Sequence, residues 1–328
     1  MPPVLLVTNH APGARVPAFA ALHAREEIEV ALFGGARRHG GADPPALPFP
    51  HRHVDQREVH ALAASGRYRA VVAGLAGRVA PLAALAGARR AGVPFVLWTG
   101  LWAHPLTPAH AASYLPTLAL YRAADAVATY GPHVSRYVAA RGARRIHVAP
   151  QAVDPAVWVD PEPAPRRDRD FQVLFVGRPS PEKGAHVLRE AWPHAVFLGD
   201  PPVGAEHIRN FLDGSDVLVI PSLRTRTFRE PWGLVANEAM HRGVPVIASD
   251  QVGAAAGGLV RHERNGLVVP AGRVAPLRAA IERLRDDADL RAALAENARR
   301  DVAPYTPTAW AEGISAALAD AGATRAGC

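Results

Sequence analysis

The feature that most constrains the fold of this chain is an alternation of short apolar runs with stretches of helical spacing. Apolar runs that alternate with helices in this way predict a parallel sheet covered on both faces. The strands predicted in the first half are Val4–Val7, Glu29–Phe33, Ala70–Ala73, Pro94–Trp98, Ala126–Thr129 and Ile146–Ala149. The helices predicted there lie near 16–25, 56–65, 79–91, 109–123 and 133–141.

A segment rich in proline and charge, Asp154–Asp170, interrupts the alternation and predicts a linker. After it the pattern restarts, so we expect two doubly wound α/β domains, 1–163 and 164–328, with a ligand-binding cleft between them. The final helix, near 307–321, can pack back on the first domain. The strands predicted in the second half are Phe171–Val176, Ala195–Leu198, Val217–Ile220, Val244–Ala248 and Leu267–Val269. The other helices predicted there lie near 183–191, 204–212, 233–242, 274–285 and 289–300.

Length and composition agree with a two-domain protein that is not embedded in a membrane. A chain of 328 residues with 49% hydrophobic content can bury two cores. It has no run of the ~18 apolar residues that span a bilayer, and its N-terminus lacks the features of a secretion signal. We therefore expect a cytoplasmic protein. The only cysteine, Cys328, excludes an internal disulfide and a thiolate metal site.

The positive charge of the chain is concentrated in its first half. Residues 1–163 hold 16 arginines against 10 acidic residues, whereas residues 164–328 hold 21 basic and 20 acidic residues. The excess can face an anionic acceptor or an anionic membrane. In the second case the protein would associate peripherally with the inner membrane face. An ordinary solvated surface explains the same excess equally well.

A first candidate motif runs from Val176 to Gly184 and contains the only lysine among 37 basic residues. It follows a predicted strand and opens a helix, and Gly177 lets the backbone approach a ligand closely. Arg178 and Lys183 place two cations beside a helix N-terminus, where free N–H groups already favour an anion. The motif predicts a diphosphate site rather than a P-loop or a GxGxxG dinucleotide site, whose glycine spacings are absent. The alternative is a strand–helix turn with surface charges.

A second candidate motif is Glu230–Met240. Pro231 and Gly233 predict a tight turn, and a helix is expected to begin at about Leu234. The amides of Gly233, Leu234 and Val235 would then be free to bind phosphate or sugar oxygens.

The second motif also contains two carboxylates, Glu230 before the helix and Glu238 within it. Carboxylates are good acceptors for vicinal sugar hydroxyls, although a capped helix with one exposed glutamate would give the same spacing. With His241–Ser249 following, the sequence resembles the retaining family-4 (group 1) glycosyltransferases of GT-B fold. The resemblance is specific over roughly 146–270 and architectural over the N-terminal half.

The resemblance implies a GT-B architecture of two Rossmann-like domains, the first binding the acceptor and the second the nucleotide-sugar donor. The second domain is shortened between Gly184 and Pro221. By the same resemblance, Arg178 and Lys183 hold the donor diphosphate. Glu230 contacts the transferred sugar, and Glu238 binds the nucleoside ribose.

The resemblance also places two candidates in the N-terminal half. The Gly-Gly that family members carry near the first strand is represented by Pro12-Gly13, which makes Gly13 a donor-binding candidate. His104 follows a predicted buried strand where family members often carry a catalytic or sugar-contacting histidine, and a structural role is the alternative. The run Ile146–Asp154 is similar to the strand that leads into the interdomain hinge.

No metal site is predicted. Asp168-Arg169-Asp170 matches an Asp-x-Asp metal motif but sits in a charge run typical of a solvated linker. The histidines around Asp55 (His51, His53 and His60) are attributed to a polar loop flanked by prolines.

The sequence therefore predicts a metal-independent retaining glycosyltransferase without a cofactor. It would move a hexose-type sugar from a nucleoside-diphosphate sugar to a hydroxyl of a glycan, a lipid-linked sugar or a small molecule. Glu230, His104, Lys183 and Arg178 are the catalytic candidates. The alternatives are an epimerase or phosphorylase on the same fold, or a degenerate protein that only binds nucleotide sugar. Nucleic-acid binding fits worst, because only 6% of residues are aromatic and the arginines are scattered.

Overall fold

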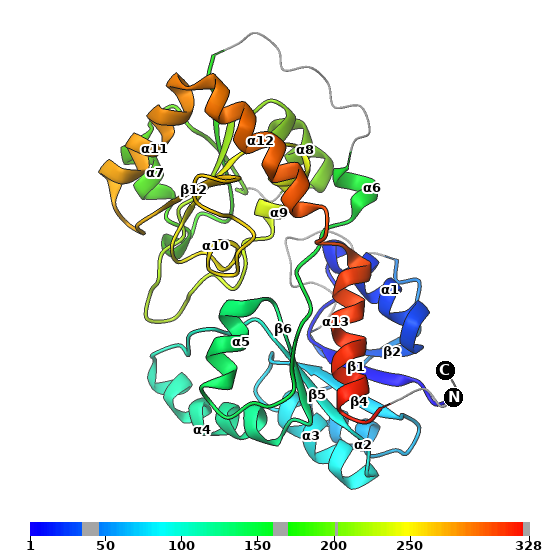
Figure 1. Cartoon of the computed structure of the whole chain (residues 1–328). Coiled ribbons are helices and arrows are strands. Elements are labelled where there is room, and N and C mark those ends of the chain that lie inside the picture. Colours follow the sequence, from blue (N-terminus) through cyan, green and yellow to red (C-terminus); the bar gives the residue numbers. More distant parts are fainter. Residues whose placement is uncertain (35–45, 160–169, 201–202, 324–328) are drawn as a thin grey trace. The chain divides into compact units, whose positions relative to one another are not determined.

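The computed structural model describes residues 1–34, 46–159, 170–200 and 203–323. Contacts divide the chain into two compact units (Figure 1). Unit 1 contains Met1–Ala152 and Thr306–Cys328, and unit 2 contains Val153–Tyr305. The boundary predicted between residues 163 and 164 lies outside the described residues, and the structure assigns Val153–Val159 to the second unit instead of the first.

Unit 1 is built on a parallel sheet with the strand order β3-β2-β1-β4-β5-β6-β7 in the described part of the chain. Val4 of β1 pairs with Ile28 on one side and with Ala70 on the other, so the strand order reverses beside β1. Ligands of open α/β sheets bind at the carboxyl ends of the strands near such a reversal. The strands are β1 (Val4–Thr8), β2 (Ile28–Leu32), β3 (His51–His53), β4 (Ala70–Gly74), β5 (Phe95–Thr99), β6 (Ala126–Thr129) and β7 (Ile146–Val148).

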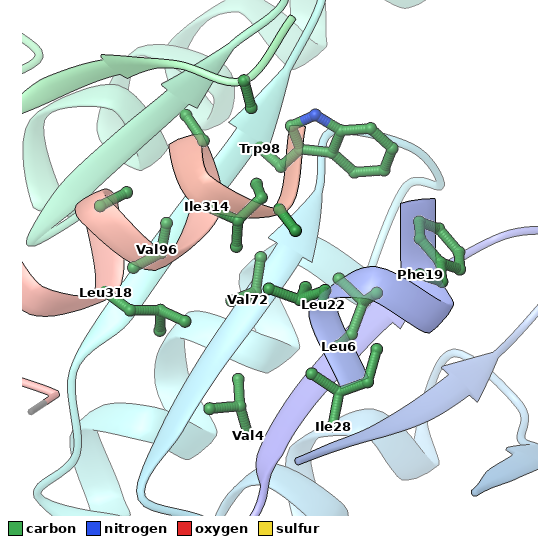
Figure 2. Packing of buried hydrophobic residues seen from close by; sticks show 14 of the residues in the cluster. Val4, Leu6, Phe19, Leu22, Ile28, Val72, Val96, Trp98, Ile314 and Leu318 are labelled. Atoms are coloured by element: carbon green, nitrogen blue, oxygen red, sulfur yellow. The ribbon is translucent and has the colours of Figure 1, made fainter. Parts of the chain in front are cut away.

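The last helix of the chain completes the core of unit 1. Trp310 of this helix is fully buried, and its ring lies 5.5 Å from Phe19 and 5.3 Å from Trp98. Figure 2 shows Ile314 and Leu318 of the same helix among the core side chains. The helices of unit 1 are the short 3-10 turn η1 (Gly13–Arg15), α1 (Val16–Glu26), α2 (Glu58–Ala63), α3 (Ala80–Ala91), α4 (Pro108–Ala123), α5 (Pro132–Ala139) and α13 (Pro307–Asp320).

Unit 2 is a second parallel sheet with the order β12-β11-β10-β8-β9 among the described residues. Its inner strands are buried on both faces, as their continuous apolar runs require. The prediction of two doubly wound α/β domains is confirmed. The strands are β8 (Val173–Val176), β9 (Val196–Leu198), β10 (Val217–Ile220), β11 (Val246–Ser249) and β12 (Gly266–Val269). The helices are α6 (Pro155–Trp158), η2 (Pro181–Lys183), α7 (Ala185–Ala191), α8 (Ala205–Asp213), α9 (Val235–His241), α10 (Gly253–Ala256), α11 (Val274–Asp286) and α12 (Ala288–Val302).

Two local predictions were wrong. His51–His53, interpreted as part of a polar loop, forms the edge strand β3 paired with β2. All three residues are exposed, so the strand has none of the apolar pattern by which sequence reasoning finds strands. The first residues of the predicted linker form α6, in which the Asp154 carboxylate accepts from the Ala156 amide and Trp158 is buried.

None of the helices in the described part of the chain combines the length and the apolar character that spanning a bilayer requires.

Candidate functional site

The loop after β8 is held against the loop after β10 by close backbone contacts. Gly184 has a positive φ of 71°, and a Cβ there would lie 2.1 Å from the Pro221 carbonyl oxygen. Any other residue would therefore be strained and would push the two loops apart. Two positions from each of these residues, the Leu223 amide donates to the Glu182 carbonyl at 2.8 Å. The two predicted motifs are thereby brought to the same end of the sheet of unit 2.

Lys183 and Glu230 form an ion pair across these two loops, although 47 positions separate them in the sequence. The Lys183 Nζ donates to Glu230 Oε2 at 2.5 Å, and the Ser222 hydroxyl donates to the same oxygen at 3.1 Å. The Glu230 side chain is 8% exposed and that of Lys183 is 20% exposed. The Phe228 ring centre lies 5.5 Å from the ammonium, within cation–π range. The only lysine of the sequence therefore lies in a cluster of polar and aromatic side chains from these loops.

The backbone around Glu230 is fixed by the segment that leads into α10. The Gly253 amide donates to the Glu230 carbonyl at 3.1 Å, and the Ala254 amide donates to the Trp232 carbonyl at 2.7 Å. A Cβ on Gly253 would lie 1.9 Å from the Pro231 carbonyl oxygen, so the two backbones approach more closely than a side chain would allow. The carboxylate of Glu230 is thus held by its backbone as well as by its partners.

The turn before α9 presents three backbone amides without an acceptor in the described part of the chain, those of Gly233, Leu234 and Val235. Gly233 has a φ of 87°, so the predicted glycine turn is present. The turn is fixed from inside, where the Trp232 indole N–H donates to Asn237 Oδ1 at 2.7 Å. The three amides lie in the half-buried part of this turn and can serve oxygens of a ligand.

Glu238 lies on α9 as a half-buried carboxylate. Its side chain forms no hydrogen bond or ion pair with any described residue. Burial raises the pKa of this carboxyl to about 7. A carboxylate that loses water without gaining a partner is costly, and hydroxyl donors of a ligand would relieve that cost.

Arg178 and Gly177, which follow β8, differ in how far their surroundings constrain them. The Arg178 side chain is 70% exposed, and its nearest acid oxygen, on Glu182, is 3.9 Å away. An exposed pair of this kind is weak, so the guanidinium can turn toward an anion at little cost. The Gly177 amide donates to the Leu198 carbonyl and joins β8 to β9, and a Cβ on Gly177 would lie 3.0 Å from the Phe175 ring. The structure explains this glycine by packing.

The two candidates of unit 1 lie in loops after its strands. Gly13 opens η1, and an added Cβ would meet no atom within 4 Å, so nothing in the described structure requires glycine there. His104 Nε2 lies 2.7 Å from the His110 carbonyl, and its ring packs edge-on against Tyr114. The His110 carbonyl can only accept, so Nε2 carries a proton, and Nδ1 is buried without a hydrogen-bond partner among the described residues.

The alternative metal sites receive no support. Within the described residues there is no group of three or more His, Cys, Asp or Glu side chains that could hold a metal ion. The rings of His51 and His53 are 6.3 Å apart on β3. Asp168 and Arg169 lie outside the described residues.

Sequence reasoning missed Ser222 and Phe228, which contact the Lys183–Glu230 pair. A signal for Ser222 exists, because it is the polar residue that directly follows β10 and Pro221, at the carboxyl edge where parallel sheets bind ligands. Phe228 has no such signal, since a single aromatic residue in a loop is common.

Replacing Ser222 by alanine is expected to lower the free energy of unfolding by about 1–2 kcal/mol, because buried Glu230 loses a donor to its charged oxygen. Urea unfolding at neutral pH measures this. Ser249→Ala is the control, a buried hydroxyl of the same region that donates to the Ser222 carbonyl, accepts from the Gln251 amide and has no charged partner. An equal or smaller loss in Ser222→Ala than in the control would contradict the charge-assisted bond.

Comparison with known proteins supports the resemblance found in the sequence. Residues 134–287 match the family model described as Glycosyl transferases group 1. This span includes Lys183, Glu230 and Glu238. This part of the chain, slightly less than half of its length, is similar to the group 1 glycosyltransferases. The suspected resemblance is thereby confirmed at the level of the family.

Several curated proteins resemble this chain over part of their length. An uncharacterized glycosyltransferase of Methanocaldococcus jannaschii is 28% identical over 180 residues, which are 44% of this chain and 43% of that protein. The alpha-D-kanosaminyltransferase of Streptomyces kanamyceticus is 34% identical over 40% of this chain and 33% of its own length. The D-inositol 3-phosphate glycosyltransferase of Paenarthrobacter aurescens is 33% identical over 38% and 30%. The chain thus spans less than half of each relative.

Solved structures match this chain over nearly its whole length. Anabaena Alr3699/HepE in complex with UDP and glucose has a TM-score of 0.74 at 18% identity, covering 97% of this chain and 100% of that chain. Sucrose-phosphate synthase from Thermosynechococcus elongatus has a TM-score of 0.75 at 17% identity, covering 96% and 98%. At such identities the match shows the fold, and the predicted GT-B class is confirmed.

Proposed function

We propose that this chain transfers a sugar from a nucleoside-diphosphate sugar to an acceptor hydroxyl. The observation that carries the proposal is the Lys183–Glu230–Ser222 cluster at the carboxyl edge of the second sheet, with unpartnered amides on the turn that follows Glu230. Relatives point the same way, since two are named for specific glycosyl transfers and the solved HepE structure contains UDP and glucose.

The leaving diphosphate would be stabilised by this cluster. The Lys183 ammonium carries three N–H donors, of which Glu230 takes one. The remaining donors, Arg178 once it turns inward, and the amides of Gly233, Leu234 and Val235 supply positive potential where charge builds as the glycosidic bond breaks. Preorganised donors of this kind contribute on the order of 3 kcal/mol each to a transition state. No metal ion is needed in this scheme.

Glu230 and Glu238 would hold the two ends of the donor. Glu230 fixes the direction of the Lys183 ammonium and can accept a hydrogen bond from the transferred sugar, because a carboxylate offers about four acceptor sites. Glu238 accepts from the ribose hydroxyls and gains the partners that it lacks in the described structure. We infer that transfer of a hexose-type sugar proceeds through an oxocarbenium-like transition state with retention of configuration.

Unit 1 would bind the acceptor. Its excess of arginine favours an anionic acceptor or an acceptor held at an anionic membrane, and we place the protein in the cytoplasm or at the inner membrane face. Gly13 and His104 are candidates to contact the ligands from this unit. For His104 to act as a general base, the ring would use Nδ1, because Nε2 is engaged by the His110 carbonyl.

A titration of the full chain with UDP, GDP, ADP and TDP sugars tests the donor assignment. We expect a UDP sugar to raise the free energy of unfolding by about 2.7 kcal/mol at 100 times its Kd, and transfer to an acceptor to keep the anomeric configuration. Absence of stabilisation by every nucleotide sugar would refute the proposal. A free rearranged sugar, or turnover that requires phosphate, would instead identify an epimerase or a phosphorylase.

A further inference from the structure

Two neighbouring helices of unit 1, α3 and α4, carry an unusual amount of exposed apolar surface. They contact each other in the structure and lie side by side in Figure 1. Of the eight large apolar side chains exposed by more than a third among the described residues, five belong to these helices or immediately precede them. These five, which we call the α3–α4 face, are Val79 (47%), Leu82 (36%), Leu106 (60%), Tyr114 (37%) and Leu115 (71%).

The composition of α4 differs from that of an ordinary surface helix. It runs from Pro108 to Ala123 without an acidic residue and with Arg122 as its only arginine. Its fully buried side chains are near its end, at Leu120 and Tyr121. Surface helices usually turn an apolar stripe to the core and polar residues to water. Most of α4 instead turns alanine, leucine and tyrosine outward.

The part of the chain that carries this face is rich in arginine. Residues 59–153 contain ten arginines and a single acid, Asp125, which is paired with Arg89, whereas Asp55 and Glu58 precede this stretch at the start of α2, which packs against α3. Arg78, next to Val79, is exposed and forms no ion pair with any described residue. The same is true of Arg90 and Arg122 near the C-terminal ends of α3 and α4. Apolar side chains near the starts of the two helices are thus accompanied by unpaired cations at Arg78 and near the C-terminal ends of the same helices.

We propose that the α3–α4 face docks on the headgroup region of an anionic lipid bilayer. Leucine and tyrosine side chains of this kind enter the interface to a shallow depth, and arginines extend along it to reach lipid phosphates. Each arginine near an anionic leaflet strengthens binding by about fivefold. A second copy of the chain fits the face poorly, because a symmetric contact would bring two equally basic surfaces together. The inference goes beyond the transfer reaction and does not depend on it.

Vesicle sedimentation with the full chain tests this docking. The wild type is expected to bind vesicles of phosphatidylcholine mixed with phosphatidylglycerol, and to bind pure phosphatidylcholine at least about tenfold more weakly. Raising the salt concentration should release it. The double variants Leu106→Ser/Leu115→Ser and Arg90→Gln/Arg122→Gln are each expected to lose about tenfold or more in affinity.

Matched controls separate docking from loss of folding or of donor binding. Val159→Ser and Arg273→Gln change an exposed valine and an exposed arginine of unit 2 and should bind vesicles as the wild type does. All variants should bind UDP like the wild type, so failure of docking and failure of the proposed function are distinguishable. Three results would overturn the inference: no binding to anionic vesicles, equal binding to both vesicle types, or a dimer in solution that the leucine variant abolishes.

Discussion

Lys183→Ala is expected to lower the rate of sugar transfer by about a hundredfold and also to destabilise the protein. The rate falls because the departing diphosphate loses a preorganised cation worth on the order of 3 kcal/mol. Stability falls because Glu230, 8% exposed, keeps its charge without its cation. That loss is about 1–3 kcal/mol, since Ser222 still donates to the same oxygen. Steady-state transfer with saturating donor and urea unfolding measure the two effects.

Two further variants separate catalysis from folding. Lys183→Ala/Glu230→Gln removes both charges, so it should recover most of the lost stability while transfer stays low. Arg178→Ala should lose transfer with almost no change in stability, because this side chain is 70% exposed and only weakly paired. Recovery of near-wild-type transfer in the double variant would show that Lys183 acts only as the counter-ion of Glu230.

The sequence alone gives no reason to expect that Lys183→Ala destabilises the protein, and the structure supplies one in the Lys183–Glu230 ion pair. The two motifs could be recognised separately, since each is a strand end followed by a turn with its own glycine and charge. Their ion pair could not, because it depends on the approach of Gly184 to Pro221 between loops nearly fifty positions apart. Sequence patterns report local backbone preference and burial, and contacts of this range are set by packing.

The difference between local sequence patterns and long-range packing also explains which elements of the fold could be predicted. The inner strands of both sheets were predicted because residues such as those of β1 are buried on both faces and form unbroken apolar runs. Strand β3 was missed because its residues are exposed. The last helix packs against unit 1, where the Trp310 ring contacts the rings of Phe19 and Trp98. An apolar helix face indicates burial without naming the sheet that covers it.

Glu238→Gln is expected to make the protein more stable at pH 8 and nearly unchanged at pH 4. Burial raises the folded pKa of this carboxyl from 4.5 to about 7, so the folded state binds more protons than the unfolded state between these values. The carboxyl therefore reduces stability as pH rises through this window, and the penalty is complete above pH 7. The shift corresponds to about 3 kcal/mol at most, and partial exposure reduces it to about 2. Urea unfolding from pH 4 to pH 8 measures it.

The same substitution should weaken nucleotide binding. A gain in stability together with a loss of binding is expected for a residue that binds the ligand and not for a poorly placed surface glutamate. Ribose hydroxyls donate to the carboxylate and favour its charged form, so wild-type affinity for a UDP sugar, whose diphosphate does not titrate in this range, should rise between pH 5.5 and pH 8 with release of a proton. Glu238→Gln should bind the UDP sugar about tenfold more weakly at pH 8 and should lose this rise. Glu296→Gln, on the exposed side of α12, is the control and should change neither property. A Glu238→Gln protein that is more stable but binds the UDP sugar normally would show that this carboxylate does not contact the nucleotide. The stability lost by burying its charge would then have no counterpart in donor binding.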